Sequence, residues 1–233
     1  MQERQCLYYF PICPFCRKIR FMLALNKVNN CCYRIENFWE KREKFCKINP
    51  TGEVPMLAVQ QDDINGIKNI VLWGQNTIMD YIRNKYPVHT LLHVDINERA
   101  KIMKYSELFD VKFNNDVVKP ILEERVYTFY KKKRSPDIDV INLARINLEE
   151  YLRFIEDILQ KRDYIATTFF SLADVSLMAQ ISSLDYLGEI NWSLHQQLKD
   201  WYVPIKSNPA FREILYDIIP DFRPSAWYRE LDF

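Results

Sequence analysis

The spacing of apolar positions divides the chain into two halves. In the first half, short apolar runs alternate with short amphipathic ones, which is typical of a small mixed sheet with helices on its faces. The expected order is β-α-β-α-β-β-α, over residues 5–10, 16–26, 31–35, 39–45, 55–59, 70–73 and 77–85. The Asp-Asp-Ile-Asn-Gly stretch at 62–66 predicts a hairpin turn between the last two strands.

After residue 87 the strand pattern stops and helical spacing takes over. A long helix is predicted over 98–130, with a kink at Pro120 because proline has no N–H to donate. A second helix carries apolar residues at helical spacing from 141 to 159. Ser135 and Pro136 are expected to be its N-cap and first helical position.

Two further helix starts are predicted from capping residues. Ser171 and Asp174 have the spacing of a capping box, for a helix that Gly188 ends. Ser193 and Gln196 repeat this spacing before the next apolar segment. The chain is therefore expected to have four parts: an α/β domain at 1–87, a linker at 88–97, an all-helical domain at 98–216 and an aromatic tail without regular structure at 217–233.

The composition excludes a disordered chain and gives no support for a nucleic-acid-binding one. The 233 residues are 48% hydrophobic, and 32 basic residues nearly cancel 31 acidic ones. Binding to a phosphate backbone needs a basic excess on one face. The basic run at 131–134 could form a nucleic-acid or membrane patch, but so short a run favours a solvated loop. No run approaches the ~18 apolar residues that span a bilayer, so neither nucleic acid nor membrane is an expected partner.

The six cysteines all lie within the first 46 residues. This crowding does not suit a secreted protein stapled by disulfides, and the sequence starts without the apolar run of about 7–15 residues of a secretory signal. We therefore predict reduced thiols and a cytoplasmic protein. Zinc is a weak alternative, because Cys31 and Cys32 point to opposite faces of a strand and the histidines are scattered. No metal is expected.

One motif carries chemistry, the Cys-Pro-Phe-Cys at 13–16 between a predicted strand and a predicted helix. With Cys13 as the N-cap, Pro14 takes the first helical position, where a missing N–H costs nothing. The helix amides and dipole then favour a thiolate at Cys13, and Cys16 lies near enough to act as a resolving thiol. Basic residues of the first two turns add positive field: Arg17, Lys18 and Arg20. The alternative is that both cysteines are inert buried apolar residues.

The first half resembles the thioredoxin-fold domain of glutaredoxins and cytosolic glutathione transferases. The resemblance rests on the Cys-Pro-Phe-Cys motif at 13–16 and on Asn-Pro-Thr-Gly-Glu-Val-Pro at 49–55. The second half resembles the helical transferase domain, especially in its Ser-Leu-Ala-Asp capping box at 171–174. The resemblance implies a glutathione transferase fold, an α/β thioredoxin-like domain followed by an all-α domain.

This resemblance also implies roles for individual residues, with glutathione as the co-substrate. Cys13 would be the catalytic thiolate and Cys16 a resolving or bystander thiol. Pro55 would follow a cis peptide bond, and the backbone of Val54 would bind the cysteinyl part of glutathione.

The sequence departs from the family pattern where the γ-glutamyl group is held. The family has Glu-Ser or Gln-Ser after the fourth strand, whereas this chain has Gly74 and Gln75. Gln75, Asn76 or Thr77 could still donate hydrogen bonds at the helix N-terminus, which remains an anion site. The acidic partner of the glutamyl ammonium is missing, and losing a charge-assisted hydrogen bond costs about 1.5–3 kcal/mol. Glutathione is therefore expected to bind more weakly than in the family.

The end of the sequence resembles a narrower bacterial branch, the glutathione-transferase-like division factors that bind the tubulin homologue FtsZ. The similar segments are 184–192, 201–212 and 222–233. Members of this branch are generally non-enzymatic and lack a cysteine at the active-site position. The aromatic residues of the tail either pack on the helical domain or also form a partner surface: Trp227, Tyr228 and Phe233.

Two functions therefore stay open. The first is a glutathione-dependent thiol transferase or transferase that acts through Cys13 on a small thiol substrate. The second is an adaptor in bacterial cell division that binds FtsZ through the helical domain and the tail. Both imply a homodimer, the commonest homo-oligomer.

Overall fold

The computed structural model describes residues 3–63, 66–86, 91–132 and 134–231. The chain divides into two compact units between residues 90 and 91. Because this boundary lies inside the predicted linker, each unit contains one of the two predicted domains.

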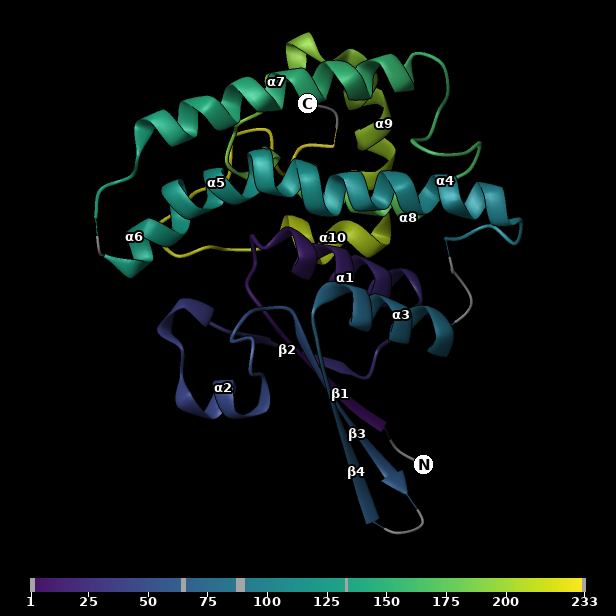
Figure 1. The fold of residues 1–233 in the computed structure, drawn as a ribbon, viewed down its shortest axis with the longest axis vertical. Coiled ribbons are helices and arrows are strands. Elements are labelled where there is room, and N and C mark those ends of the chain that lie inside the picture. The colour runs from purple at the N-terminus through teal and green to yellow at the C-terminus, as the bar shows by residue number, and fades with distance from the viewer. Residues whose placement is uncertain (1–2, 64–65, 87–90, 133, 232–233) are drawn as a thin grey trace. The chain divides into compact units, whose positions relative to one another are not determined.

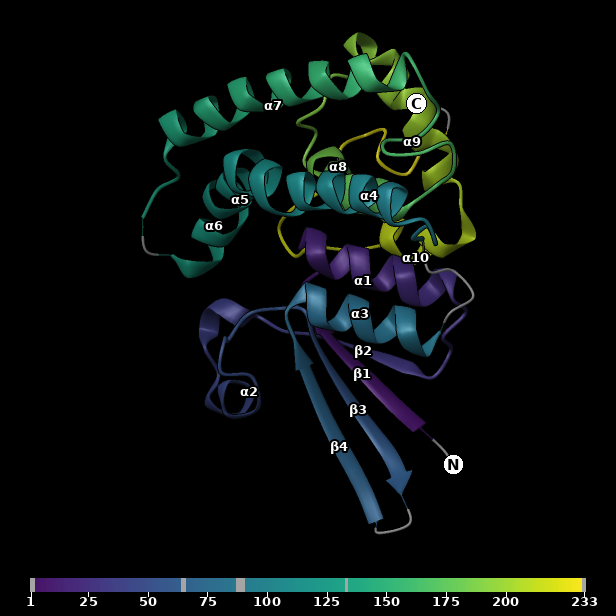
Figure 2. The same ribbon diagram turned by 45° about the vertical axis from the view of Figure 1, so that its right-hand side comes forward.

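The first unit is a four-stranded sheet in the order β2-β1-β3-β4, in which only the β1–β2 pair is parallel. Helices α1 and α3 lie side by side on one face of the sheet (Figure 1 and Figure 2). The elements are β1 (Glu3–Tyr9), α1 (Pro14–Leu25), β2 (Cys31–Ile35), the 3₁₀ turn η1 (Phe38–Glu40), α2 (Glu43–Ile48), β3 (Met56–Asp63), β4 (Gly66–Trp73) and α3 (Gln75–Lys85). The predicted order of strands and helices is confirmed.

Two details of the first unit differ from the prediction. The single helix expected over 39–45 is instead η1 followed by α2, because Lys41 has a φ of 50° and interrupts the helical backbone. The hairpin strands β3 and β4 are longer than their apolar cores, since their pairing continues out to Asp63 and Gly66. The predicted turn between them falls on residues 64–65, outside the described residues.

The regular secondary structure of the second unit is helical in the residues that the structure describes, apart from one isolated bridge between Ile219 and Phe222. Its first helical run packs against α7 and α8 (Figure 1). The elements are α4 (Ile96–Glu107), the π-helical η3 (Leu108–Val118), α5 (Lys119–Leu122), the π-helical η4 (Glu123–Tyr127), α6 (Thr128–Lys131), α7 (Ile138–Leu159), α8 (Leu172–Tyr186), η5 (Trp192–Leu194), α9 (Gln196–Lys206), η6 (Pro209–Phe211) and α10 (Arg212–Leu215).

The run from α4 to α6 corresponds to the long helix predicted over 98–130. It begins two residues earlier, because the Asp95 carboxylate accepts hydrogen bonds from the backbone of Asn97 and Glu98. Pro120 lies in a short α-helical segment between two π-helical ones, η3 and η4. Proline has no N–H to donate to the helix, and here the helix changes to π-helical turns on both sides of it.

The core of the second unit is α8, which is buried on every side. The predicted capping box starts it, and the helix ends just before Gly188, whose φ is 70°. Asp174 does more than cap. Its Oδ1 accepts from the Ile165 amide at 2.9 Å and the Trp201 indole at 3.0 Å, and its Oδ2 accepts from the Ser171 amide and hydroxyl at 2.9 and 2.8 Å. Burial nevertheless raises the pKa of this carboxyl.

The other two predicted caps were wrong. Helix α7 begins one residue after Asp137, which accepts from two backbone amides, so Ser135 and Pro136 precede the helix. Ser193 lies inside η5, which Asn191 caps, and α9 begins at Gln196 after His195, whose side chain makes no cap hydrogen bond. At α7 the nearby Asp137 supplies the acceptor, and an aspartate is at least as good as serine at an N-cap.

The described part of the tail packs onto the helical unit. Tyr228 is fully buried and donates a hydrogen bond to the Ile214 carbonyl at 3.1 Å. The Trp227 indole donates to Asp185 at 3.1 Å, and the Lys206 ammonium donates to the Trp227 carbonyl at the same distance. Phe233 lies outside the described residues. The tail is therefore part of the folded unit at Trp227 and Tyr228.

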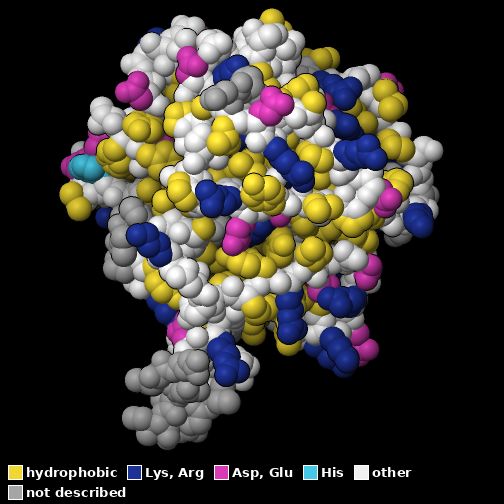
Figure 3. Space-filling model, turned by 180° about the vertical axis from the view of Figure 1, so that it is seen from behind, with side chains coloured by type: hydrophobic (Ala, Val, Ile, Leu, Met, Phe, Trp, Pro, Cys, Tyr) yellow, Lys and Arg dark blue, Asp and Glu magenta, His cyan; other side chains and the backbone are white. Residues whose placement is uncertain are grey.

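The surface charges are mixed. On the face seen in Figure 3, Lys and Arg side chains are interspersed with Asp, Glu and apolar side chains. Within the basic run at 131–134, Lys131 pairs with Glu123 and Arg134 pairs with Glu124. These pairs lower the positive potential of the run. None of the helices in the described part of the chain is long and apolar enough to cross a bilayer.

Replacing Asp174 should destabilise the protein strongly. Asp174→Ala removes the acceptor of four hydrogen-bond donors, so we expect a loss of about 3 kcal/mol, more than the ~0.5–2 kcal/mol of a lost cap. The control, Ser171→Ala, should cost about 1 kcal/mol because the carboxylate keeps its other donors. Urea midpoints measure both, and equal midpoints for the two variants would contradict the central role of the carboxylate.

Candidate functional site

Cys13 lies where the sequence places it, at the junction between β1 and α1. Its backbone is extended, with φ −65° and ψ 119°, and Pro14 follows as the first helical residue. The Cys13 amide donates to the Phe10 carbonyl, and the Cys13 carbonyl accepts from Arg17. The predicted N-cap position of Cys13 is therefore confirmed, although its side chain makes no cap hydrogen bond.

The two thiols of the motif have opposite pKa shifts. Burial raises the pKa of Cys13, but the Cys16 side chain and the backbone amides of Cys16 and Phe15 lower it, and the net shift is downward. Burial and the neighbouring Cys13 raise the pKa of Cys16 well above its usual range. Cys13 is thus the member of the pair that ionises first, as a nucleophile paired with a protonated partner requires.

The largest influences on the pKa of Cys13 do not include the basic residues of α1. Arg17 is buried and donates to the Pro11 carbonyl at 2.8 Å. The Arg20 guanidinium lies 4.7 Å from the centre of the Tyr9 ring, and its charge lowers the pKa of Cys16. The amides at the start of α1 and the Cys16 thiol take the place of these side chains in favouring the Cys13 thiolate.

The Cys13 sulfur is close to the loop that precedes β3. It lies 3.9 Å from the Val54 carbonyl oxygen, within reach of a weak hydrogen bond from the thiol. The Val54–Pro55 peptide is cis, as the resemblance implied. Both residues are buried, and Cys13 is 6% exposed while Cys16 is 0% exposed. So little of Cys13 is exposed that an inert buried thiol stays an alternative to a reactive one.

Asn49 fixes the loop at 49–55. Its side chain donates to the Glu53 carbonyl at 2.7 Å and accepts from the amide and hydroxyl of Thr51. Gly52 has a φ of 62°, which favours glycine, and its carbonyl accepts from Lys41. Sequence reasoning gave Asn49 no role of its own, although an Asn before a Pro-Thr-Gly turn is a recognisable turn former.

The start of α3 shows how the chain differs from the family pattern. Gly74 is the N-cap, with φ 81° and no side chain to cap the helix, and the first turn has no acidic residue. Gln75 is half-buried, and its Oε1 has no hydrogen-bond partner among the described residues. Asn76 and Thr77 are exposed. This helix end offers amide donors to an anion and no carboxylate to an ammonium group.

The remaining cysteines do not join the motif. Cys6 and Cys32 are paired positions of β1 and β2, and burial together with Cys32 raises the pKa of Cys6 to about 12. Within the described residues no three His, Cys, Asp or Glu side chains come together as metal ligands.

An aromatic cluster near the motif was missed by sequence reasoning. The rings of Phe10 and Trp39 meet edge to face with centroids 4.8 Å apart, and Phe38 packs on both. The adjacent aromatic residues at 38–39 could have indicated this cluster, but residue 39 was assigned to the helix expected over 39–45. The cluster packs η1 against the residue whose carbonyl accepts from the Cys13 amide.

The comparison with protein families matches residues 12–85 to the N-terminal domain of glutathione S-transferases. Among curated proteins, FtsZ-localized protein A of Caulobacter vibrioides is 32% identical over 233 residues, which is 100% of both chains. Glutathione S-transferase 2 of Schizosaccharomyces pombe is 23% identical over 184 residues, covering 77% of this chain and 76% of that protein.

Solved structures agree over nearly the whole chain. FzlA from C. crescentus superposes with a TM-score of 0.91 and 32% identity, covering 99% of this chain and 100% of that one. A glutathione S-transferase from Rhodospirillum rubrum superposes with a TM-score of 0.87 and 31% identity, covering 98% and 100%. The match thus extends through both compact units.

The lowered pKa of Cys13 predicts how it reacts with pH. Its alkylation rate should rise through a midpoint below the ~8.5 of a free thiol, because a depressed pKa keeps the thiolate present at lower pH. Cys6 should stay unlabelled at neutral pH. Cys16→Ala should move the Cys13 midpoint upward, since it removes the thiol that stabilises the thiolate. Mass-spectrometric mapping after brief iodoacetamide exposure measures each rate, and equal labelling of Cys13 and Cys46 at every pH would contradict the prediction.

Proposed function

Because this chain belongs to the glutathione S-transferase family and is homologous to FtsZ-localized protein A along its whole length, we propose that it binds FtsZ as an adaptor in bacterial cell division. The observation that carries the proposal is the 32% identity over all 233 residues. The identity includes the helical unit and the tail, whereas the family model covers residues 12–85. FtsZ association is the property in the name of this relative.

The geometry of the first unit supports an adaptor in two ways. Gly74 and Gln75 leave no carboxylate for the γ-glutamyl ammonium of glutathione, so a main anchor of the usual co-substrate is missing. Cys13 is nearly buried beside the Val54 carbonyl, the group that would bind the cysteinyl part of glutathione. An adaptor does not need glutathione, whereas weak glutathione binding would slow a transferase.

A glutathione-dependent thiol transferase is the second candidate, and the lowered pKa of Cys13 favours it. The Cys13 thiolate would attack the glutathionyl sulfur of a mixed disulfide, so that the old S–S bond breaks and the substrate leaves as a thiolate. A second glutathione thiolate would then attack the Cys13 mixed disulfide, forming glutathione disulfide and restoring Cys13. Val54, Pro55, Gln75 and Asn76 would hold glutathione, and Cys16 would be a resolving or bystander thiol.

Both candidates fit a cytoplasmic homodimer, the usual arrangement of a closed two-fold assembly. Sedimentation velocity gives the oligomeric state directly, and calorimetric titration with glutathione measures whether the site keeps its co-substrate.

Cys13→Ser separates the two candidates. As an adaptor, the protein should co-sediment with polymerised FtsZ from its own organism, and Cys13→Ser should pellet to the same extent, because a buried thiol at the start of α1 is not a filament contact. Any reduction of a glutathione mixed disulfide should be abolished by the same change, since a serine hydroxyl at an N-cap stays protonated. Cys46→Ser, a cysteine outside the motif, is the matched control for both assays.

The outcomes point in different directions. A wild-type protein that stays in the supernatant at every FtsZ concentration would overturn the adaptor proposal. Turnover that survives Cys13→Ser would overturn the thiol transferase. Pelleting together with Cys13-dependent turnover would mean that the chain does both.

The tail supplies a second test of the adaptor. Deleting 227–233 would remove the buried Tyr228 and the anchored Trp227, so it would lower stability as well as any binding. Removing only 229–233 spares both anchors. We expect this shorter truncation to weaken pelleting with FtsZ at least fivefold, by about the energy of one interface contact, while the urea midpoint stays close to that of the full chain. Unchanged pelleting would show that the tail serves folding rather than FtsZ binding.

A further inference from the structure

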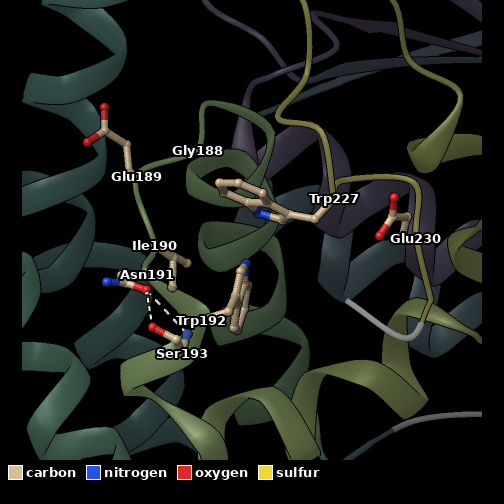
Figure 4. A pocket seen from close by; sticks show the side chains of 8 residues that line it. All are labelled: Gly188, Glu189, Ile190, Asn191, Trp192, Ser193, Trp227 and Glu230. Carbon is tan, nitrogen blue, oxygen red and sulfur yellow. Dashed lines mark hydrogen bonds between the residues drawn. The ribbon is translucent and has the colours of Figure 1, made fainter.

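The helical unit contains a pocket for which neither candidate function supplies a small-molecule ligand. It has a volume of about 420 Å³ and lies between the segment after α8 and the tail (Figure 4). Its walls include Gly188, Ile190, Asn191, Trp192, Trp227 and Glu230. This volume is within the range of small-molecule sites, about 300–1,000 Å³.

A single buried carboxylate orients the two indole rings of the pocket. The Nε1 atoms of Trp192 and Trp227 both donate to Asp185 Oδ1, at 3.0 and 3.1 Å. Asp185 is completely buried. Because the N–H of each ring is bonded to this carboxylate, only carbon atoms of the rings remain to contact a ligand in the pocket. Trp192 is buried and stacks on Tyr202, whereas Trp227 is half-buried, so Trp227 supplies most of the aromatic surface that the pocket exposes.

Gly188 lies close to the tail beside the Trp227 ring. Its φ is 70°, and a Cβ there would lie 3.9 Å from Trp227 Cζ2 and 3.4 Å from the Ser225 Cβ. The Ser225 hydroxyl donates to the Asp185 carbonyl at 2.8 Å. The segment after α8 and the tail thus meet closely beside the pocket.

The charge that faces the pocket is negative. Glu230 lies at the exposed rim beside Trp227, and its carboxylate makes no hydrogen bond or ion pair with any described residue (Figure 4). Glu189 also lines the pocket, but its side chain points away from the indoles and pairs with Arg125 and Arg145. Lys206 is buried behind the wall, where Asp185 balances its charge at 3.4 Å.

We propose that this pocket binds a small organic cation, of the quaternary ammonium or guanidinium class. Aromatic faces attract such cations through the negative charge of the π system, most strongly for tryptophan, and a nearby carboxylate adds a Coulombic contribution. Trp192 and Trp227 supply the aromatic wall, and Glu230 supplies the carboxylate. No lysine or arginine is among the described residues that line the pocket, and the Lys206 ammonium nearby is buried and paired with Asp185.

The test uses a cation and its neutral isostere. Choline and methylguanidinium are titrated into the full-length ¹⁵N-labelled protein at constant ionic strength, beside 3,3-dimethylbutan-1-ol, which has the shape of choline without its charge. The indole N–H signals of Trp192 and Trp227, assigned with Trp→Phe variants, should shift and saturate at millimolar concentrations of one or both cations. The neutral alcohol should leave them unmoved at the same concentrations.

Glu230→Gln tests the carboxylate without touching the core, because the residue is exposed. We expect the dissociation constant of the cation to rise about fivefold, as for the loss of one partly exposed charge contact. Glu150→Gln, an exposed residue on α7, makes the same charge change elsewhere and should leave the constant unchanged. Equal shifts with the neutral alcohol, no saturable shift with either cation, or equal effects of the two Glu→Gln variants would each overturn the proposal.

Discussion

A helix that is buried on every side needs partners inside the protein for the carboxylates that it carries. Helix α8 is such a helix, and its two carboxylates, one near each end, are hydrogen-bonded to the surrounding chain. Asp174, at the start, collects donors from the helix itself, from the segment before it and from α9. Asp185, at the end, collects the indoles of Trp192 and Trp227 and the Lys206 ammonium. Through the two carboxylates, α8 is bonded to the segment before it, to the segment after it, to α9 and to the tail.

In the thioredoxin-like unit, the chemistry depends on the position of the Cys13 sulfur at the start of α1. Burial alone would suppress ionisation of Cys13, and a fully exposed thiol would gain little from the helix. The extended backbone of Cys13 and the proline after it direct the first amides of α1 at the sulfur, and Cys16 adds its thiol. The cis Val54–Pro55 peptide brings a backbone carbonyl to the same place. The unit therefore has the framework of thiol chemistry, although the first turn of α3 carries no acidic residue.

The sequence allowed prediction of what depends on local spacing. The strand and helix order, Cys13 as N-cap and the capping box at Ser171 and Asp174 are all encoded within a few consecutive residues, so the patterns were sufficient. The two wrong caps have different causes. At α7, Asp137 takes the place of the serine two residues before it. Before α9, Ser193 lies in the separate turn η5, so α9 starts without a side-chain cap.

The residues around the pocket depend on contacts between segments far apart in the sequence, which periodicity does not report. Trp192 and Trp227 are 35 positions apart, yet they donate to the same oxygen atom. Nothing in either local sequence indicates a shared partner. The same holds for the pKa of Cys13, which depends on burial and on amide directions that no motif states. The positions of the motif residues could thus be predicted from the sequence, whereas the effects of distant segments on their contacts and pKa values could not.

The shared acceptor at Asp185 makes the tail and the segment after α8 thermodynamically interdependent. If either indole is lost, the remaining one faces a carboxylate with fewer donors, so the energetic effect of changing one tryptophan depends on whether the other is present. Substitutions at the two positions should therefore be non-additive, and the two segments should open and close as one cooperative unit. A substitution of Trp192 or Trp227 alone therefore leaves Asp185 with one indole donor fewer. The sequence of the tail is constrained by the core of the helical unit as well as by any partner that the tail binds.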